Sequence, residues 1–140
     1  MAPIPMTDEE CRLATEALSE QLDLYATLLV RKGVALERGQ ELVLEAPVER
    51  ADFARRVVSA AYRAGAGHVT VIWRDDVVSR LTYESCELSF FEHTPSWQVE
   101  QLNSLAEAGA AFLFLEGQDP AALKGIDPAK TAAASRARNT

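Results

Sequence analysis

The chain has 140 residues, close to the commonest size of a single domain, with 48% hydrophobic and 25% charged residues. This is the composition of an ordinary globular protein with its own core, and it argues against a fibrous or largely disordered chain. The formal net charge of −7 argues against nucleic-acid binding, since a phosphate backbone needs a basic face. The basic residues near the C-terminus, Lys130, Arg136 and Arg138, have the spacing of a solvated helix face.

The cysteines and the N-terminal residues predict a cytoplasmic protein. Cys11 and Cys86 lie far apart and follow neither a metal nor a redox spacing, as is usual in a reducing compartment. Residues 1–6 are expected to form a flexible arm, without the basic and then apolar pattern of a signal peptide. No stretch approaches the roughly 20 apolar residues of a membrane helix, so no membrane partner is expected.

The first predicted element is a long helix from Thr7 to Arg31. Thr7 is a suitable N-cap, Gly33 is a stop signal, and the length of the pattern leaves room for a break near Ser19. The helical spacing predicts a buried face made of Leu22, Tyr25, Ala26, Leu29 and Val30.

A strand–helix–strand unit is predicted between Gly39 and Asp76. The apolar residues 42–44 predict a buried strand, which Ala46–Pro47 ends because proline cannot donate to a ladder. The next segment repeats apolar residues at helical spacing, namely Phe53, Val57, Ala60, Ala61 and Ala64. The exposed side of this helix is predicted to carry Arg50, Arg55, Arg56 and Arg63. After a cap at Gly65, residues 69–73 predict a second buried strand.

The second half of the chain predicts helices around one further strand. A short helix is expected over residues 77–82, capped by Asp75 or Asp76, and Thr94–Pro95 opens another helix that ends at Gly109. The inner face of the latter helix is predicted to hold Trp97, Leu102, Leu105 and Ala106. Residues 111–115 predict a third buried strand, and Asp119–Pro120 and Asp127–Pro128 predict two more helix starts.

This alternation predicts an α/β fold in three layers, a small, mostly parallel sheet of three strands flanked by helices. The whole chain, residues 1–140, is interpreted as one domain. A sheet of three strands leaves edges open, and the last helix stops without a clear cap or a following strand. We therefore expect an incomplete domain.

The chain shows no recognisable catalytic or metal-binding pattern. His68 and His93 belong to no metal-ligand pair, and neither a Gly-x-Ser-x-Gly elbow nor a Walker-type phosphate loop occurs. The turn after the first strand lacks the glycines of a dinucleotide loop, and Glu45 and Glu49 beside it would repel a pyrophosphate. Catalytic and metal-binding residues are therefore predicted to be absent.

Polar residues follow all three predicted strands and are expected to meet at one edge of the sheet. They are Glu49, Arg74, Asp75, Asp76, Glu116, Gln118 and Asp119. Carboxylates that converge there could hold a cation or an amino group. The capping of the helices that follow is the favoured interpretation of Asp75, Asp76 and Asp119. For Trp73, a contact surface for a partner domain and a place in the core are equally supported.

Several of these segments, in the same order and at similar spacing, resemble the thermophilic aminopeptidase family of dinuclear metallopeptidases, which includes aminopeptidases S and T. The matching pieces are LDLYATLLVRKGVAL with GQELVLEAPVE, AYRAGAGHVTVIWRDD with the four residues 80–83 that follow, Trp97, AEAGAAFLFLEGQDP, and LKGIDPAKTAAASRAR. The resemblance implies a cytoplasmic, dimeric enzyme about three times as long, which removes N-terminal residues from peptides. It also implies two divalent metal ions, zinc or cobalt, bound by a C-terminal catalytic domain that this chain lacks.

The resemblance transfers no catalytic or metal-binding residue to this chain. It implies a non-catalytic N-terminal domain that supports the substrate cavity and contacts the missing catalytic domain. The residues expected to line that cavity or the domain interface are Pro47, Glu49, Trp73, Arg74, Asp75, Asp76, Gln118 and Asp119. One alternative is a stand-alone α/β binding or interaction module. Another, less favoured, is a small enzyme that uses Asp75, Asp76 and Asp119.

Overall fold

The computed structural model describes residues 4–116 and 124–138. Its helices are α1 (Asp8–Leu28), α2 (Ala51–Arg63), α3 (Asp76–Ser85), α4 (Leu88–Phe91), α5 (Ser96–Glu107) and α6 (Pro128–Arg138). Its strands are β1 (Glu41–Pro47), β2 (His68–Arg74) and β3 (Ala111–Phe114). A π-helical turn (Leu29–Gly33) follows α1, and a 3₁₀ turn (Val48–Arg50) follows β1. All three strands were predicted, whereas α4 was not.

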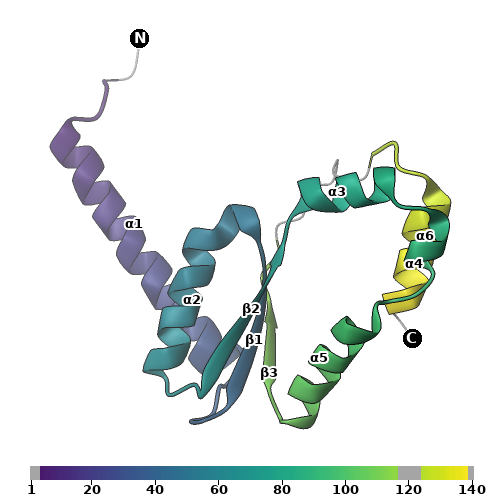
Figure 1. Cartoon of the computed structure of the whole chain (residues 1–140). Coiled ribbons are helices and arrows are strands. Elements are labelled where there is room, and N and C mark those ends of the chain that lie inside the picture. The colour runs from purple at the N-terminus through teal and green to yellow at the C-terminus, as the bar shows by residue number, and fades with distance from the viewer. Residues whose placement is uncertain (1–3, 117–123, 139–140) are drawn as a thin grey trace.

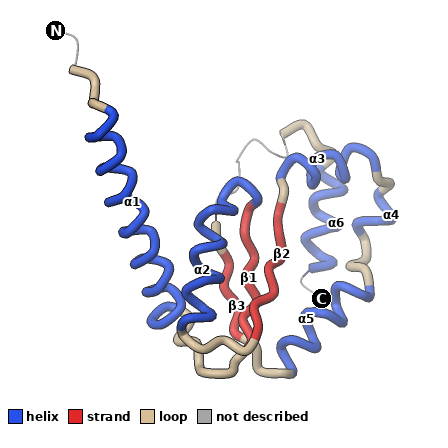
Figure 2. The backbone as a smooth tube through the Cα atoms, turned by 60° about the vertical axis from the view of Figure 1, so that its left-hand side comes forward, coloured by secondary structure: helices blue, strands red, loops and turns tan. Residues whose placement is uncertain are grey.

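The strands of the described chain form one parallel sheet in the order β2-β1-β3. Leu42 of β1 lies opposite Val69 of β2 and Ala111 of β3. Helices α1 and α2 lie on one side of the sheet and α5 on the other, as Figures 1 and 2 show. The predicted three-layer α/β arrangement is therefore confirmed.

The core lies between the sheet and the two helices α1 and α2. Successive side chains of a strand point to opposite faces, so alternate residues of β1 enter this core. The buried cluster contains Leu42, Leu44 and Ala46 from β1, Ala26 and Val30 from the first helical segment, and Ala54, Val57, Ala60 and Ala61 from α2. The helical spacing thus predicted Val57, Ala60 and Ala61 correctly, whereas Phe53 and Ala64 are only partly buried against the cluster and Ala54 was not predicted.

Helix α1 differs from its prediction in two respects. It runs without a break near Ser19, and the irregularity comes instead at the π-helical turn, which ends at Gly33 as predicted. Tyr25 was placed on the buried face but is 53% exposed, with its ring stacked on that of Phe53. The predicted cap is confirmed, because Thr7 and Glu10 form a reciprocal capping box.

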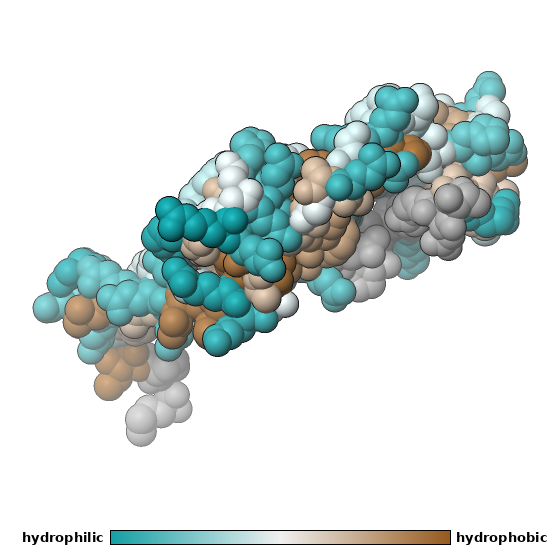
Figure 3. Space-filling model, turned by 90° about the horizontal axis from the view of Figure 1, so that it is seen from below, coloured by the Kyte–Doolittle hydropathy of each residue, from teal (hydrophilic) through white to brown (hydrophobic). Residues whose placement is uncertain are grey.

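The N-terminal half of α1 extends beyond the body of the protein as an arm (Figure 1). Every residue from 8 to 18 is exposed. Seen from below, the molecule has an elongated outline, with hydrophobic patches separated by hydrophilic residues (Figure 3).

The predicted inner face of α5 is wrong for its large residues. Trp97 is 64% exposed and Leu102 is 42% exposed, and none of the side chains of α5, all of them described, is buried. The reason is the direction of the helix. Helix α5 leans away from the sheet toward α4 and α6 (Figure 1). Side chains whose spacing is typical of a buried face therefore stay exposed.

Helices α3, α4 and α6 gather beyond the carboxyl end of β2 and form what we call the helical lobe (Figures 1 and 2). The Lys130 ammonium donates to the Tyr83 carbonyl at 2.8 Å, and the Arg80 guanidinium donates to the Lys124 carbonyl at 2.6 Å. The Thr94 hydroxyl donates to the Ala137 carbonyl at 3.2 Å. These bonds attach α6 to α3 and to the start of α5.

Candidate functional site

The carboxyl ends of the three strands meet at one edge of the sheet, which we call the strand-end edge. Pro47, the last residue of β1, lies opposite Arg74, the last residue of β2. The amide of Leu115, just after β3, donates to the Glu45 carbonyl of β1 at 2.8 Å. The structure therefore brings the predicted residues Pro47, Trp73, Arg74 and Asp75 into one region.

Arg74 joins the three strands at this edge. Its Nη1 atom lies 3.3 Å from Oε1 of Glu45, and its Nη2 atom donates to the Leu115 carbonyl at 3.1 Å. The two charged side chains are 27% and 30% exposed, so the ion pair is partly shielded from water. The Nε atom of Arg74 is buried and has no hydrogen-bond partner among the residues that the structure describes.

Asp75 serves as the N-cap of α3. Its Oδ1 atom accepts hydrogen bonds from the amides of Val77, at 2.9 Å, and Val78, at 3.2 Å. These bonds satisfy two of the free amides that begin a helix, so the capping interpretation is confirmed for Asp75. Asp76 is the first residue of α3, where its negative charge interacts favourably with the positive end of the helix dipole.

The other predicted residues of the edge have different surroundings. Pro47 is buried, and Glu49 is exposed on the 3₁₀ turn. Trp73 is 44% exposed, so its placement in the core is wrong and a half-exposed indole lies at the edge. Glu116 is exposed just after β3, whereas Gln118 and Asp119 lie outside the described residues.

The described residues do not fit a site for two metal ions. Within residues 4–116 and 124–138, no three His, Cys, Asp or Glu side chains group closely enough to hold a metal ion. The two histidines lie in different parts of the fold, since His68 begins β2 and His93 follows α4. Glu45 is paired with Arg74, and Asp75 caps α3. The side chains that could ligate a metal ion are therefore far apart or already engaged in an ion pair or a helix cap.

A concave feature, the helical-lobe pocket, lies between α3, α4, α6 and the start of α5. It has a volume of about 420 Å³ and is lined by apolar and polar side chains, including Tyr83, Phe90, Phe91 and His93. This pocket was not predicted from the sequence, because α4, which supplies two of its aromatic rings, was not predicted. One sequence signal could have indicated this pocket. It is the pair of consecutive residues Phe90 and Phe91 before the Thr94–Pro95 helix start.

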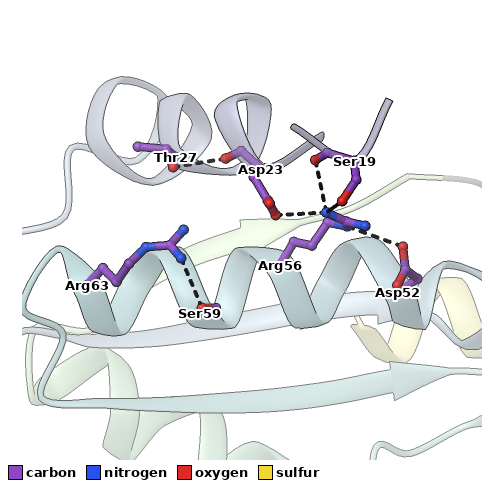
Figure 4. Close-up of polar contacts among 7 residues, drawn as sticks. All are labelled: Ser19, Asp23, Thr27, Asp52, Arg56, Ser59 and Arg63. Carbon is purple, nitrogen blue, oxygen red and sulfur yellow. Dashed lines mark hydrogen bonds and ion pairs between the residues drawn. The ribbon is translucent and has the colours of Figure 1, made fainter. Parts of the chain in front are cut away.

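A charged group with several partners lies away from both features, between α1 and α2 (Figure 4). Nη1 of Arg56 donates to the Ser19 carbonyl and hydroxyl, both at 3.0 Å, and to Asp23 at 2.8 Å, while Nε contacts Asp52 at 3.3 Å. The hydrogen bond with Asp23 raises the pKa of the Arg56 guanidinium above its ordinary value, against the opposing effect of desolvation.

Comparison with known proteins identifies the family. Residues 18–140 match the sequence model of the thermophilic metalloprotease (M29) family, which covers most of the chain. Aminopeptidase AmpS of Bacillus subtilis (strain 168) is 40% identical over 122 residues, which are 87% of this chain and 30% of that protein. Aminopeptidase T of Thermus aquaticus is 35% identical over 124 residues, which are 89% of this chain and 30% of that protein.

The solved structure of wild-type AmpT from Thermus thermophilus has the same fold over most of this chain. The TM-score is 0.78 at 36% sequence identity, and the match covers 85% of this chain and 30% of that one. The chain therefore belongs to the thermophilic metalloprotease family. It spans about 30% of the length of the curated relatives it matches.

In the described part of the chain, no helix combines the length and the apolar character needed to cross a bilayer.

Proposed function

We propose that this chain is the non-catalytic N-terminal domain of a metal-dependent aminopeptidase, an enzyme that hydrolyses N-terminal residues from peptides. The observation that carries this proposal is the family match over residues 18–140, combined with relatives named aminopeptidases that are about three times as long. The His, Cys, Asp and Glu side chains of the described residues are dispersed, which agrees with a structural role for this domain.

The strand-end edge is the proposed lining of the substrate cavity and the contact with the catalytic domain. In parallel α/β sheets, ligands bind beside the carboxyl ends of the strands. The half-exposed Trp73 and the ion pair of Arg74 with Glu45 give this edge one aromatic and one polar contact surface. The proposed lining comprises Pro47, Glu49, Trp73, Arg74, Asp75, Asp76, Gln118 and Asp119.

The metal ions belong to the part of a family-length protein that this chain does not contain. There, two divalent ions, zinc or cobalt, would activate a water molecule and polarise the scissile carbonyl. We further propose a cytoplasmic enzyme that assembles as a homodimer. The two cysteines, which are both free, are consistent with a reducing compartment.

The proposal predicts that the purified 140-residue chain does not cleave amino-acid p-nitroanilides when zinc or cobalt is added. The same chain should support cleavage when it replaces the matching segment of Bacillus subtilis aminopeptidase AmpS, because the catalytic part is then present. Release of p-nitroaniline, measured by absorbance for both proteins under the same conditions, checks this.

Metal-dependent cleavage by the 140-residue chain alone would overturn the non-catalytic assignment. A folded chimera that binds metal but has no activity would favour the alternative, a stand-alone binding module, over the domain of an aminopeptidase.

A further inference from the structure

The helical-lobe pocket has the size of a ligand site, and it plays no part in the function proposed for the strand-end edge. Its volume of about 420 Å³ lies within the range of roughly 300–1,000 Å³ that small-ligand sites occupy. Its aromatic part is ordered by ring contacts. Tyr83 stacks on Phe91 with ring centroids 4.7 Å apart, and Phe90 meets Phe91 edge to face at 5.2 Å. Phe91 is buried, whereas Phe90 is 50% exposed and presents an open ring.

Several large apolar side chains on the helices that form the pocket are exposed. On α3, Val77 is 65% exposed, Val78 is 56% exposed and Leu81 is 54% exposed, and the last two share one face of the helix at i and i+3. Leu88 at the start of α4 is 40% exposed. Apolar side chains on adjoining helices around a concavity are typical of a docking site.

The charges near α4 indicate which side chains the occupant carries. Glu87 precedes α4 and Glu92 follows it, and both are exposed and without an ion-pair partner among the residues that the structure describes. By contrast, Glu84 is paired with Arg80 at 2.9 Å. The Lys130 ammonium lies 6.0 Å from the centroid of the Phe91 ring, and this single positive charge leaves the two carboxylates of Glu87 and Glu92 in excess. An apolar side chain that enters the pocket is therefore stabilised when a positive charge lies beside it.

We propose that the helical-lobe pocket receives an aromatic or leucine side chain, flanked by lysine or arginine, from the remaining part of a family-length polypeptide. The source of this segment rests on the proposed function. The chain spans about 30% of its relatives, so most of a family-length protein lies outside it. The pocket also adjoins the strand-end edge, because α3 begins directly after the carboxyl end of β2 (Figure 1).

Titration of the ¹⁵N-labelled 140-residue chain with benzylamine, followed by NMR, tests the pocket itself. Benzylamine should shift and saturate the amide signals of Tyr83, Phe90 and Phe91, and the uncharged benzyl alcohol should bind more weakly. The substitution Phe90→Ser should raise the benzylamine Kd by about tenfold. The matched control Phe114→Ser removes a ring that is 59% exposed on β3, away from the pocket, and should leave the Kd unchanged.

The charge argument has its own variant. The double substitution Glu87→Gln and Glu92→Gln should lower the affinity for benzylamine to that for benzyl alcohol. An unsaturable titration, shifts confined to other elements, or equal effects of Phe90→Ser and Phe114→Ser would overturn the assignment of the pocket. This outcome is independent of the aminopeptidase proposal, because only the isolated chain is used.

Hydrogen exchange identifies the occupant. Residues 77–91 should exchange more slowly in the chimera with Bacillus subtilis AmpS than in the isolated chain, and Phe90→Ser should restore fast exchange there. Protected β1 amides show that the chimera is folded. If it is not folded, the same comparison is made on the corresponding segment of intact AmpS and its own N-terminal fragment. If residues 77–91 exchange equally fast in the chimera and in the isolated chain while benzylamine still binds, the occupant does not come from the same polypeptide. The pocket would then bind a separate protein.

Discussion

Arg56 shows how a single residue joins two helices. Helical spacing predicted it on the exposed side of α2, but the structure turns its guanidinium toward α1, and its side chain is only 21% exposed. Its partners are Asp52 on its own helix and Ser19 and Asp23 on α1 (Figure 4). Charge-assisted hydrogen bonds of this kind are stronger than neutral ones, so Arg56 holds α1 at a defined position on α2.

Replacement of Arg56 by methionine is predicted to lower the melting temperature clearly, because Asp23 and the Ser19 carbonyl lose their shared donor. Arg63→Met is the matched control on the same helix, since Arg63 is exposed and, among the described residues, makes a single 3.3 Å hydrogen bond, to Ser59. Differential scanning calorimetry of both variants makes the comparison. Equal melting temperatures would show that the Arg56 contacts do not stabilise the fold.

The pH dependence of this effect follows from the raised pKa of Arg56. A group with a raised pKa in the folded state stabilises fully below its unfolded-state pKa and loses its effect only as the pH rises through the folded-state value. Both values lie far above neutrality for arginine. The difference between wild type and Arg56→Met should therefore stay constant from about pH 6 to about pH 9.

Arg74 is the corresponding residue at the strand-end edge. Arg74→Met is predicted to lower the free energy of unfolding by roughly 1–2 kcal/mol, because the Leu115 carbonyl loses a donor and Glu45 loses its partner. Arg55→Met, on the exposed side of α2, should change it by less than about 0.5 kcal/mol. Urea unfolding, followed by circular dichroism, measures both. If Arg74→Met leaves the free energy of unfolding unchanged, Arg74 does not stabilise the fold by joining the strands.

At the scale of elements, the turn before β2 packs against the turn before β1. The Gly39 amide donates to the Gly65 carbonyl at 2.7 Å, and the Gly67 amide donates to the Gln40 carbonyl at 2.9 Å. Gly65 has a φ of +101°, which confirms its predicted role as the cap after α2. A Cβ atom on Gly67 would lie 2.6 Å from the Gly39 carbonyl oxygen, so only glycine permits this approach.

Gly67→Ala is therefore predicted to destabilise the protein by about 1–3 kcal/mol, since the two turns must separate. Gly33→Ala is the control, because a Cβ there meets only Leu29 Cδ2 at 3.8 Å, an ordinary contact. That change should be neutral or slightly stabilising. Chemical denaturation of the two alanine variants checks the pair, and similar losses in both would contradict the close-approach argument.

At the scale of the whole molecule, stability is expected to be unequal. The main buried cluster lies in the sheet with α1 and α2. In the helical lobe, the buried hydrophobic side chains of the described residues are Phe91 and Ala133. Regions with few buried apolar contacts open at a lower free energy than the core does.

Native-state hydrogen exchange should therefore show slow exchange in β1 and faster exchange in α3, α4 and α6. The exposed arm at residues 8–18 should exchange fastest, because none of its residues is buried and its first turn is held by a capping box on the surface. Mass spectrometry of peptic fragments resolves these segments. Equal protection of the helical lobe and β1 would contradict the division into a stable sheet and a weaker lobe.

The strand-end edge could be predicted in part. Asp75 was predicted as a cap because an aspartate before a helical pattern has a local partner in the amides that follow it. The bonds of Arg74 were not predictable, since its partners Glu45 and Leu115 lie 29 and 41 residues away along the chain. The exposure of Trp97 and Leu102 was mispredicted for a similar reason, because spacing defines a helix face but not what that face meets.

The sequence by itself determined the elements and their order. Apolar runs, helical spacing and caps are local, so they predicted the three strands, the core face of α2 and the parallel α/β class. Only the tertiary structure decided the strand order β2-β1-β3, the strand-joining role of Arg74, the tie of Arg56 to α1 and the helical-lobe pocket. These features depend on the relative placement of elements that are distant in the chain, which packing determines and local spacing does not encode.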